Sequence, residues 1–600
     1  MRAVWGTADG SGVDVKEALR EKVEGALRGL LDEAGDEGEL PDFALEVPRQ
    51  KDHGDYSCNA AMMLAKRLRR KPRDIAENLK ARIGAADGLV ASLDVAGPGF
   101  LNITLAESGW QGLLHEIISA GTGYGQSRSA EAAAAGRGDA RPKVQVEFVS
   151  ANPTGPLSTG HGRQGILGDC IARLLEATGW NVTREYYFND GGRQMRVLGD
   201  SVKARYLESL GLAAKPPPAA LADPEKAWVE EVDGLPVAFP ADGYQGEYIS
   251  DIAAALSEQE GDSLVDEPGD GRFRDEAQRV IFEEIERTLT RIGIVFDVYY
   301  NERSLYDEGK LDETIRDLRE AGLVYDAEGA VWFKATARGL DRDRVVIKSS
   351  GEPTYLLPDI AYHREKFRRG FDRVIDVQGA DHIEQFPFVR EATDVLGVDG
   401  DRVELVLHQF VTITSDGERV KQSTRKATFV TIDELVDDVG PDVFRFFMIE
   451  RKPDGHLDFD LDLAKDKNWR KNPAYYVQYA HARTHGIERK AAEQGVAMPG
   501  ANGFDASRLG LQEEIELVKK LATFPEVVIR AAEGREPHHI AYYLREVAGL
   551  WNPYLQDGSR HRVLSEDAEL SAARLGLALA IRNVLASGLG LLGISAPERM

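Results

Sequence analysis

A histidine between two glycines stands where a predicted strand leads into a predicted helix. The stretch 146–169 (VEFVSANPTGPLSTGHGRQGILGD) leaves a short strand at 143–149 and enters a helical pattern near His161. A nucleotide bound there needs close backbone approach, which Gly160 allows, the positive end of a helix, and a phosphate donor such as His161. A tight strand–helix turn without a ligand is the alternative, because such a short motif is weak by itself.

A second stretch gathers positive charge. Residues 417–431 (GERVKQSTRKATFVT) include Arg419, Lys421, Arg425 and Lys426 against one glutamate. A basic loop of this kind can deliver charge to a leaving pyrophosphate. An exposed basic turn is the alternative.

Two carboxylates, Glu147 and Asp359, have both a binding and a structural interpretation. Tyr355 and Asp359 are four residues apart, so they share a face if the segment is helical. A carboxylate such as Asp359 accepts a guanidinium bidentately, although aspartate also commonly caps a helix, here one over 360–366. Glu147 lies in an apolar strand and needs a cationic partner, which is either a ligand or a structural salt bridge.

These residues require a sheet that brings strand ends together. The order of strand, loop, helix and a second strand at 182–188 is typical of a doubly wound α/β domain. Residues 374–377 and 403–407 read as further buried parallel strands. Gln378, Gly379 and Asp381 follow the first of these, at the edge where ligands bind in such folds. After about residue 463, the apolar spacing is helical throughout.

Composition limits the class of protein. The formal net charge is −26 and 42% of residues are hydrophobic, which excludes wholesale disorder and a generic polyanion-binding coat. Residues 207–270 contain fifteen acidic residues against two lysines, and a solvated surface insertion is the favoured interpretation. The two cysteines, Cys58 and Cys170, predict no disulfide and no cysteine zinc site. With no signal peptide evident and 583–597 too short to span a bilayer, we expect a cytoplasmic protein without membrane contact.

Two motifs carry a resemblance to a known family. Residues 158–161 (STGH) resemble the HIGH motif of class I aminoacyl-tRNA synthetases, and 146–157 (VEFVSANPTGPL) most resembles the arginyl-tRNA synthetases. Ser158 replaces the first histidine of the motif, so one imidazole donor is lost. Residues 421–425 (KQSTR) resemble the KMSKS loop in an MSTR-like variant with Thr424 at the second lysine, whose electrostatic role we assign to Lys421 or Lys426 as a hypothesis.

The resemblance covers nearly the whole chain and implies a division into domains. The expected parts are an α+β tRNA-binding-like domain at 1–124, a linker at 125–142, a Rossmann-like parallel-sheet catalytic domain at 143–465 with the insertion 207–270, and an all-α anticodon-binding bundle at 466–600.

The resemblance also implies roles for individual residues. The expected catalytic residues are His161, Lys421 and Lys426. ATP contacts are expected from Ser158, Gly160, His161, Gly379, Asp381 and Ser423. Arginine contacts are expected from Glu147, Ser150, Asn152, Tyr355, Asp359, Gln378 and, from outside the catalytic domain, Asn102. Contacts with tRNA are expected from Tyr476, Tyr479, Arg483 and Met600. Tyrosines interleaved with arginine in 471–485 suit stacking on unpaired bases, although an aromatic stripe is more often core.

The implied activity is that of an arginine–tRNA ligase. Arginine would be activated by Mg²⁺-bound ATP and transferred to the terminal ribose of tRNA(Arg), with no protein-bound metal and with the enzyme acting as a monomer. Two alternatives stay open: a class I synthetase for another amino acid, and a non-catalytic tRNA-binding paralogue, which Ser158 and Thr424 motivate because both motifs have lost a usual group.

Overall fold

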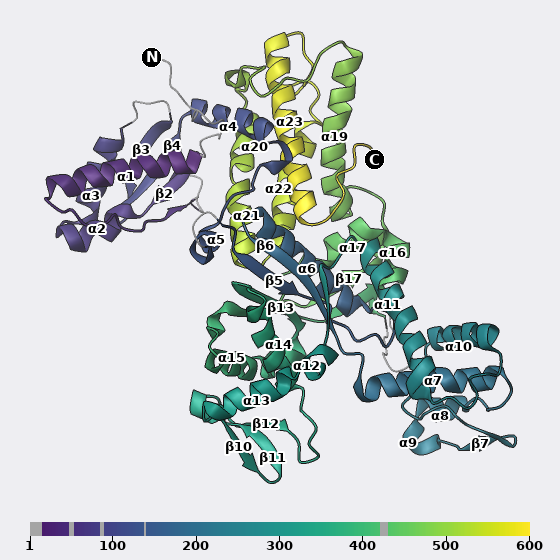
Figure 1. Cartoon of the computed structure of the whole chain (residues 1–600). Helices are drawn as coiled ribbons and strands as arrows, with labels where there is room; N and C mark the ends of the chain where they lie inside the picture. Colours follow the sequence, from purple (N-terminus) through teal and green to yellow (C-terminus); the bar gives the residue numbers. More distant parts are fainter. Residues whose placement is uncertain (1–14, 47, 49–52, 85–88, 137–139, 421–429) are drawn as a thin grey trace.

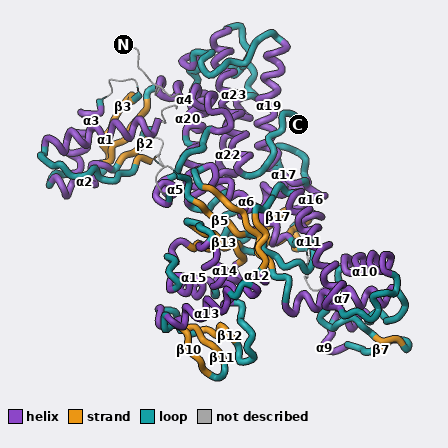
Figure 2. The backbone as a smooth tube through the Cα atoms, viewed as in Figure 1, coloured by secondary structure: helices purple, strands orange, loops and turns teal. Residues whose placement is uncertain are grey.

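A five-stranded parallel sheet forms the centre of the protein. The computed structural model describes residues 15–46, 48, 53–84, 89–136, 140–420 and 430–600. The central sheet has the order β14-β13-β5-β6-β9, and every neighbouring pair is parallel. Its strands are β5 (Lys143–Glu147), β6 (Asn181–Phe188), β9 (Val298–Asn301), β13 (Arg373–Gly379) and β14 (Val403–His408). The predicted Rossmann-like sheet is confirmed, and Figure 2 shows its strands surrounded by helices.

The two faces of this sheet are covered by different helices. Val144 and Val146 alternate with Gln145 and Glu147 along β5, so the two pairs point to opposite faces. Gln145 and Glu147 contact helix α14 (Leu356–Arg368). Helix α6 (Thr159–Ala177) is the crossover from β5 to β6 and packs on the sheet across β5, β6 and β13.

A separate α+β region precedes the sheet. Its antiparallel sheet has the order β1-β2-β4-β3 and carries three helices, as Figure 1 shows in purple. The elements are α1 (Val15–Glu33), β1 (Leu45–Glu46), β2 (Tyr56–Cys58), α2 (Ala60–Leu68), α3 (Pro72–Ile83), β3 (Val90–Ala96) and β4 (Phe100–Leu105), followed by α4 (Glu107–Ala120). The segment predicted as a linker holds a short helix, α5 (Ala130–Ala135), whose Glu131 pairs with Arg535 at 2.7 Å.

The acidic insertion is a folded lobe. It contains the end of α7 (Gly192–Ser209), then α8 (Pro218–Ala222), α9 (Pro224–Ala227), β7 (Glu231–Val232), β8 (Leu235–Pro236) and α10 (Glu247–Glu260). Figure 1 shows it projecting away from the N-terminal region. Phe239, Ile249 and Leu256 are buried, and the Tyr248 hydroxyl donates to the Thr154 carbonyl at 2.8 Å. Ile249 and Leu256 belong to the same hydrophobic core as the central sheet, so the insertion packs on the main body and contacts the loop that leads into α6.

The remaining elements of the central region flank the sheet. They are α11 (Arg274–Arg291), α12 (Arg303–Asp307), α13 (Lys310–Glu320), β10 (Val324–Ala327), β11 (Ala330–Phe333), β12 (Arg344–Ile347), α15 (Phe386–Val395), β15 (Val411–Ser415), β16 (Glu418–Arg419), α16 (Ile432–Val439), α17 (Pro441–Met448), β17 (Leu457–Asp460) and α18 (Leu461–Lys465).

The C-terminal region is an all-α bundle, as predicted. Its helices are α19 (Pro473–Glu493), α20 (Gln512–Ala522), α21 (Phe524–Glu533), α22 (His538–Tyr554) and α23 (Ala568–Leu591). By length and composition α23 could cross a membrane, but 72% of its most apolar window is buried inside the protein. Burial of this kind is typical of a core helix.

Candidate active site

A strained turn follows β5 and brings the side chain of Ser150 against Glu147. Val149 and Ser150 have φ angles of 67° and 42°, a region that residues other than glycine rarely adopt. The turn brings the Ser150 hydroxyl back to donate to Glu147 Oε1 at 3.0 Å, and Ser150 Oγ accepts the Tyr187 N–H at 3.1 Å. Glu147 is thus held by its own loop at the carboxyl edge of the sheet.

His161 lies in the first turn of α6 as a neutral donor. The backbone N–H of Ser158 donates to His161 Nδ1 at 3.2 Å, which places the ring proton on Nε2. Burial lowers the pKa of His161 to about 4, so the ring is uncharged at neutral pH. Among the described residues, a Cβ added at Gly160 would meet only the Ser158 hydroxyl, at 3.7 Å, so none of their other side chains lies within 4 Å of that position. The N-terminal turn of α6 (Ser158 to His161), called the helix mouth below, therefore offers an anion the N–H donor of His161 and accessible backbone at Gly160.

The chain beyond the basic loop returns to this same helix mouth. Thr159 Oγ1 donates to the Val430 carbonyl at 3.0 Å, and the Ile432 N–H donates to the Leu157 carbonyl at 3.0 Å. Lys421, Ser423 and Lys426, three of the predicted site residues, lie outside the described residues.

Asp359 forms an acidic position beside Glu147. Burial raises its pKa to about 7, reinforced by Glu147 and Glu302, while His363 and a hydrogen bond from Gln385 oppose the shift. Helix α14 begins at Leu356 with Tyr355 at its N-cap, so the alternative in which Asp359 caps a helix over 360–366 is wrong.

Other predicted residues lie around the same edge. Gln378 and Gly379 end β13, the strand beside β5, and Asp381 follows in a 3-10 turn (Ala380–Glu384). Gln164, one turn after His161, donates to the Val377 carbonyl at 2.6 Å and so ties α6 to this strand end. Tyr355 is 80% exposed at the start of α14, where a ligand could still reach it.

Two predicted arginine contacts have protein partners. Asn152 accepts the Asn189 N–H at 3.0 Å and donates to Gln194 Oε1 at 3.0 Å. Asn102 lies in β4, where Ser57 Oγ donates to its side-chain oxygen at 3.1 Å. Figure 1 shows β4 apart from β5 and α14, so the structure does not bring Asn102 to the other residues, and its role stays a prediction.

Sequence reasoning did not predict the buried ion pairs that Lys366 makes with Glu147 and Asp376. Lys366 is fully buried on α14, and its Nζ lies 2.6 Å from Glu147 Oε2 and 2.7 Å from Asp376 Oδ1. The predicted structural salt bridge of Glu147 is therefore confirmed, with Lys366 as its partner, and a ligand at Glu147 stays a prediction. The spacing of Asp359, His363 and Lys366 in one helix was an available signal, because it places all three on one face.

An aromatic surface with cations lies at the start of the C-terminal bundle. Trp469 stacks on Tyr479 with ring centroids 4.1 Å apart and on Tyr476 at 6.0 Å. Arg470 lies over Trp469 and Arg483 over Tyr479, at 4.8 and 5.6 Å. An open cavity of about 560 Å³ adjoins it, lined by Arg470, Lys471, Pro473, Tyr476, Tyr542, Arg545 and Glu546. Met600 is 57% exposed.

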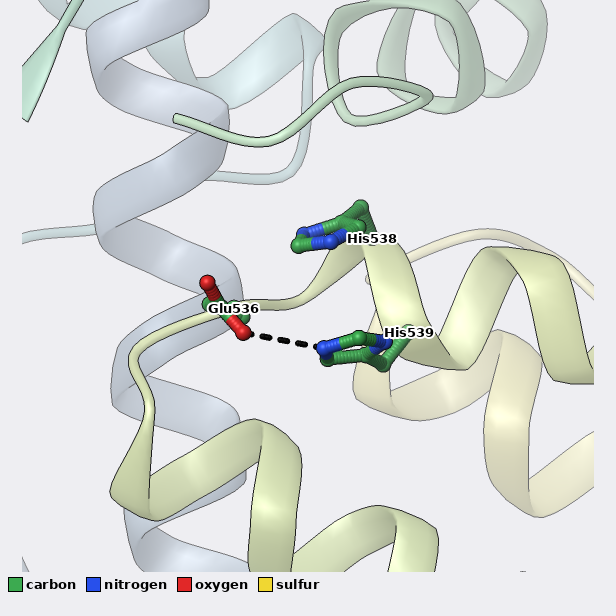
Figure 3. A group of neighbouring side chains, drawn as sticks. All are labelled: Glu536, His538 and His539. Carbon is green, nitrogen blue, oxygen red and sulfur yellow. Dashed lines mark hydrogen bonds and ion pairs between the residues drawn. The ribbon is translucent and has the colours of Figure 1, made fainter. Parts of the chain in front are cut away.

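One group in the described part of the chain has the residue types of a metal site. Glu536, His538 and His539 offer ligand atoms within 4.8 Å of one another at the start of α22 (Figure 3). Glu536 already accepts from His539 at 2.9 Å and lies 3.5 Å from the Lys452 ammonium. Because that ammonium repels a second cation and the two imidazole centroids lie only 4.3 Å apart, we assign no metal to this group.

Comparisons with known proteins agree with this geometry. Family models match along the chain: "Arginyl tRNA synthetase N terminal domain" at 15–105, "tRNA synthetases class I (R), catalytic domain" at 130–454 and "DALR anticodon binding domain" at 477–600. The arginine–tRNA ligase of Desulfotalea psychrophila is 47% identical over 97% of this chain and 100% of its own length. That of Salinibacter ruber is 45% identical over 98% and 100%. The Thermus thermophilus arginyl-tRNA synthetase structure has the same fold, with a TM-score of 0.69 at 23% identity over 98% of this chain and 100% of that one.

The sheet, the helix mouth and the catalytic-domain match together define a class I aminoacyl-tRNA synthetase. Within that class, the chain belongs to the arginyl-tRNA synthetase family, because the identity is high and extends over the full length of its relatives. The family predicted from the two sequence motifs is confirmed.

Proposed function

We propose that this arginine–tRNA ligase works through one edge of its parallel sheet, where Glu147 from β5, Asp359 from α14 and His161 from α6 converge. The enzyme is an ATP-dependent ligase that joins arginine to tRNA(Arg). Support for this site comes from Asp359, whose pKa is raised by burial and by the nearby charge of Glu147, and from helix α6, whose Gln164 donates to the end of β13 beside β5.

The two carboxylates suit the two cationic groups of arginine. Asp359 receives the guanidinium, whose planar fork matches a carboxylate. Glu147 receives the α-ammonium group, and Ser150, Asn152, Gln378 and Tyr355 are assigned as further arginine contacts by family resemblance. Lysine presents a single ammonium group in place of the fork, so it leaves acceptor positions on Asp359 unpaired.

Arginine binding should weaken in acid. The pKa of Asp359 in the free enzyme is about 7, and the guanidinium needs the ionised form. Below that pH the carboxyl group is protonated, so Kd for arginine rises about tenfold per pH unit, and above it Kd is constant. Calorimetric titration of the enzyme with arginine, without ATP, measures this directly. A flat Kd between about pH 6 and 8 contradicts the assignment.

The nucleotide occupies the neighbouring helix mouth. His161 donates from Nε2 to the phosphates, and Ser158 and the backbone of Gly160 approach them. Gly379 and Asp381, at and just after the end of β13, are assigned to the nucleotide by family resemblance. Lys421, Ser423 and Lys426 are assigned to the pyrophosphate by family resemblance alone. Mg²⁺ enters with the substrate ATP, and no protein ligand is assigned to it.

The chemistry is two transfers without an enzyme nucleophile. An oxygen of the arginine carboxylate attacks the α-phosphorus, the bond to the bridging oxygen breaks, and pyrophosphate leaves. The 2′-hydroxyl of the terminal ribose then attacks the acyl carbon, loses its proton, and displaces AMP. Catalysis is therefore positioning and charge stabilisation, to which His161 contributes as a donor.

Removing the His161 donor should slow activation. We expect His161→Ala to lower kcat for ATP–pyrophosphate exchange about 10²-fold, because one preorganised donor is typically worth that much. The matched control is His456→Ala, which removes an imidazole from an exposed ion pair with Asp458. Equal rates in the two variants would contradict the role of His161.

The aromatic surface is assigned to the tRNA. Tyr476, Tyr479 and Arg483 were predicted, and the structure adds Trp469 to the stack. We expect Trp469→Ala or Tyr479→Ala to raise KM for tRNA about 10- to 100-fold, since each stacked base is worth about 1–3 kcal/mol. Tyr325→Ala, which breaks a similar stack on Trp332 in the β10–β12 sheet, is the control. An unchanged KM for tRNA would mean that the stack is only structural.

One experiment tests the whole proposal. Purified enzyme is assayed for aminoacylation of tRNA(Arg) and for pyrophosphate exchange with each amino acid, with tRNA present. Arginine-specific charging supports the proposal, and exchange with a different amino acid or tRNA binding without charging overturns it. A monomeric state and a cytoplasmic location stay predictions.

A further inference from the structure

Lys366 shares its charge between two buried carboxylates. Its ammonium is fully buried and contacts Glu147 and Asp376, which lie opposite each other on the neighbouring strands β5 and β13. One carboxylate would neutralise the lysine. Because Lys366 also contacts Asp376, Glu147 is a second carboxylate at the same buried ammonium. Burying two negative charges beside one positive charge costs free energy unless a second cation lies nearby.

His363 adds the second cation of this cluster. Its Nδ1 lies 2.8 Å from the backbone carbonyl oxygen of Asp359, and its Nε2 lies 2.7 Å from Asp376 Oδ2. Both partners offer acceptor oxygens, so donation from both ring nitrogens requires the imidazolium form. Although burial opposes it, Lys366 and His363 together hold the pKa of Asp376 well below its usual range.

The charges of the cluster complement one substrate. Glu147, Asp359 and Asp376 contribute three negative charges, and Lys366 and His363 contribute two positive charges when all five are ionised. Free arginine carries one net positive charge. Each oxygen of Glu147 has one protein donor, from Lys366 or from Ser150, and so keeps a lone pair for an incoming ammonium group.

We propose that Lys366, His363 and Asp376 are positioning residues that hold Glu147 as the receptor of the α-ammonium group of arginine. Asp376 pairs with both His363 and Lys366, which fixes the position of the Lys366 ammonium. Lys366 then pairs with Glu147 Oε2 and fixes the side chain of Glu147. This inference rests on the proposed function, because it presumes that arginine binds at Glu147 and Asp359.

The test separates positioning from simple stability. Lys366→Met alone leaves Glu147 without its cation and Asp376 with His363 only, which can unfold the protein. The main variant is therefore Lys366→Met with Asp376→Asn, which removes one charge of each sign. Thermal unfolding verifies that it folds. The ligands are arginine and 5-guanidinopentanoate, which keeps the guanidinium and carboxylate but lacks the α-amino group.

We expect KM for arginine in tRNA-dependent pyrophosphate exchange to rise about 10- to 100-fold, which is the range for losing a hydrogen bond to a charged group. The inhibition constant of 5-guanidinopentanoate and KM for ATP should change less than about threefold, because neither ligand uses Glu147. The matched control, Lys310→Met with Glu365→Gln, removes a 3.1 Å ion pair that also involves α14 and should leave all three constants near wild type.

Two results overturn the inference. If KM for arginine and the inhibition constant of 5-guanidinopentanoate rise by the same factor, the variant affects the whole pocket and not Glu147 in particular. If KM for arginine is unchanged, Glu147 does not depend on Lys366 and Asp376 for its position. Failure of the proposed function is distinguishable, because it appears in the wild-type enzyme as a lack of arginine-dependent exchange.

Discussion

Asp359→Asn lowers kcat/KM for arginine by a factor of about 10³ or more, the largest effect on activity that we expect. The amide has nearly the shape of the carboxylate but no charge, and it offers the guanidinium one acceptor oxygen and a repelling N–H₂ group. Removing one member of a desolvated charge pair costs about 3–5 kcal/mol, because the other charge stays buried without a partner.

Steady-state exchange with arginine and with citrulline measures this effect. Citrulline is neutral at the end of its side chain, so the variant should lose much of the preference for arginine that the wild type has. Asp326→Asn is the control, because that carboxylate lies in an exposed pair with Arg319. Wild-type preference in Asp359→Asn would remove Asp359 from the guanidinium site.

Arg445→Met destabilises the protein by about 3–5 kcal/mol, the largest effect on stability that we expect. Arg445 is 1% exposed and donates to the carbonyls of Ile292 and Leu592, at 2.7 and 2.8 Å. These residues end α11 and α23, and Arg445 also pairs with buried Asp169 on α6. Losing the guanidinium leaves two helix C-termini without their cation and removes one of the three arginines that pair with Asp169, the others being Arg173 and Arg184.

Denaturant unfolding of Arg445→Met gives the free energy change. Arg319→Met, which breaks an exposed pair, should cost less than about 1 kcal/mol. An effect of Arg445→Met no larger than that of the exposed control would show that the buried pair contributes nothing.

Local patterns predicted most of the framework. Apolar runs indicated β13 and β14, and the glycine-rich stretch around His161 predicted the start of α6, which the structure places at Thr159. The family resemblance assigned Asp359 to the arginine site, which stays a prediction, and its capping alternative could not be excluded until the helix start was known. These features depend on neighbours in sequence, so short-range periodicity and motif spacing suffice.

The amino-acid sequence by itself determined the family, the order of the elements and the residue types at the helix mouth. Only the tertiary structure decided which buried charges meet: Lys366 with Glu147 and Asp376, which are 219 and 10 residues away from it, and Arg445 with Asp169, 276 residues away. Such pairings leave no periodic trace, because a charge in an apolar segment has many candidate partners. The packing of distant elements brings one of these candidate partners next to the charge. Water is excluded there, so a charge without that partner would cost free energy.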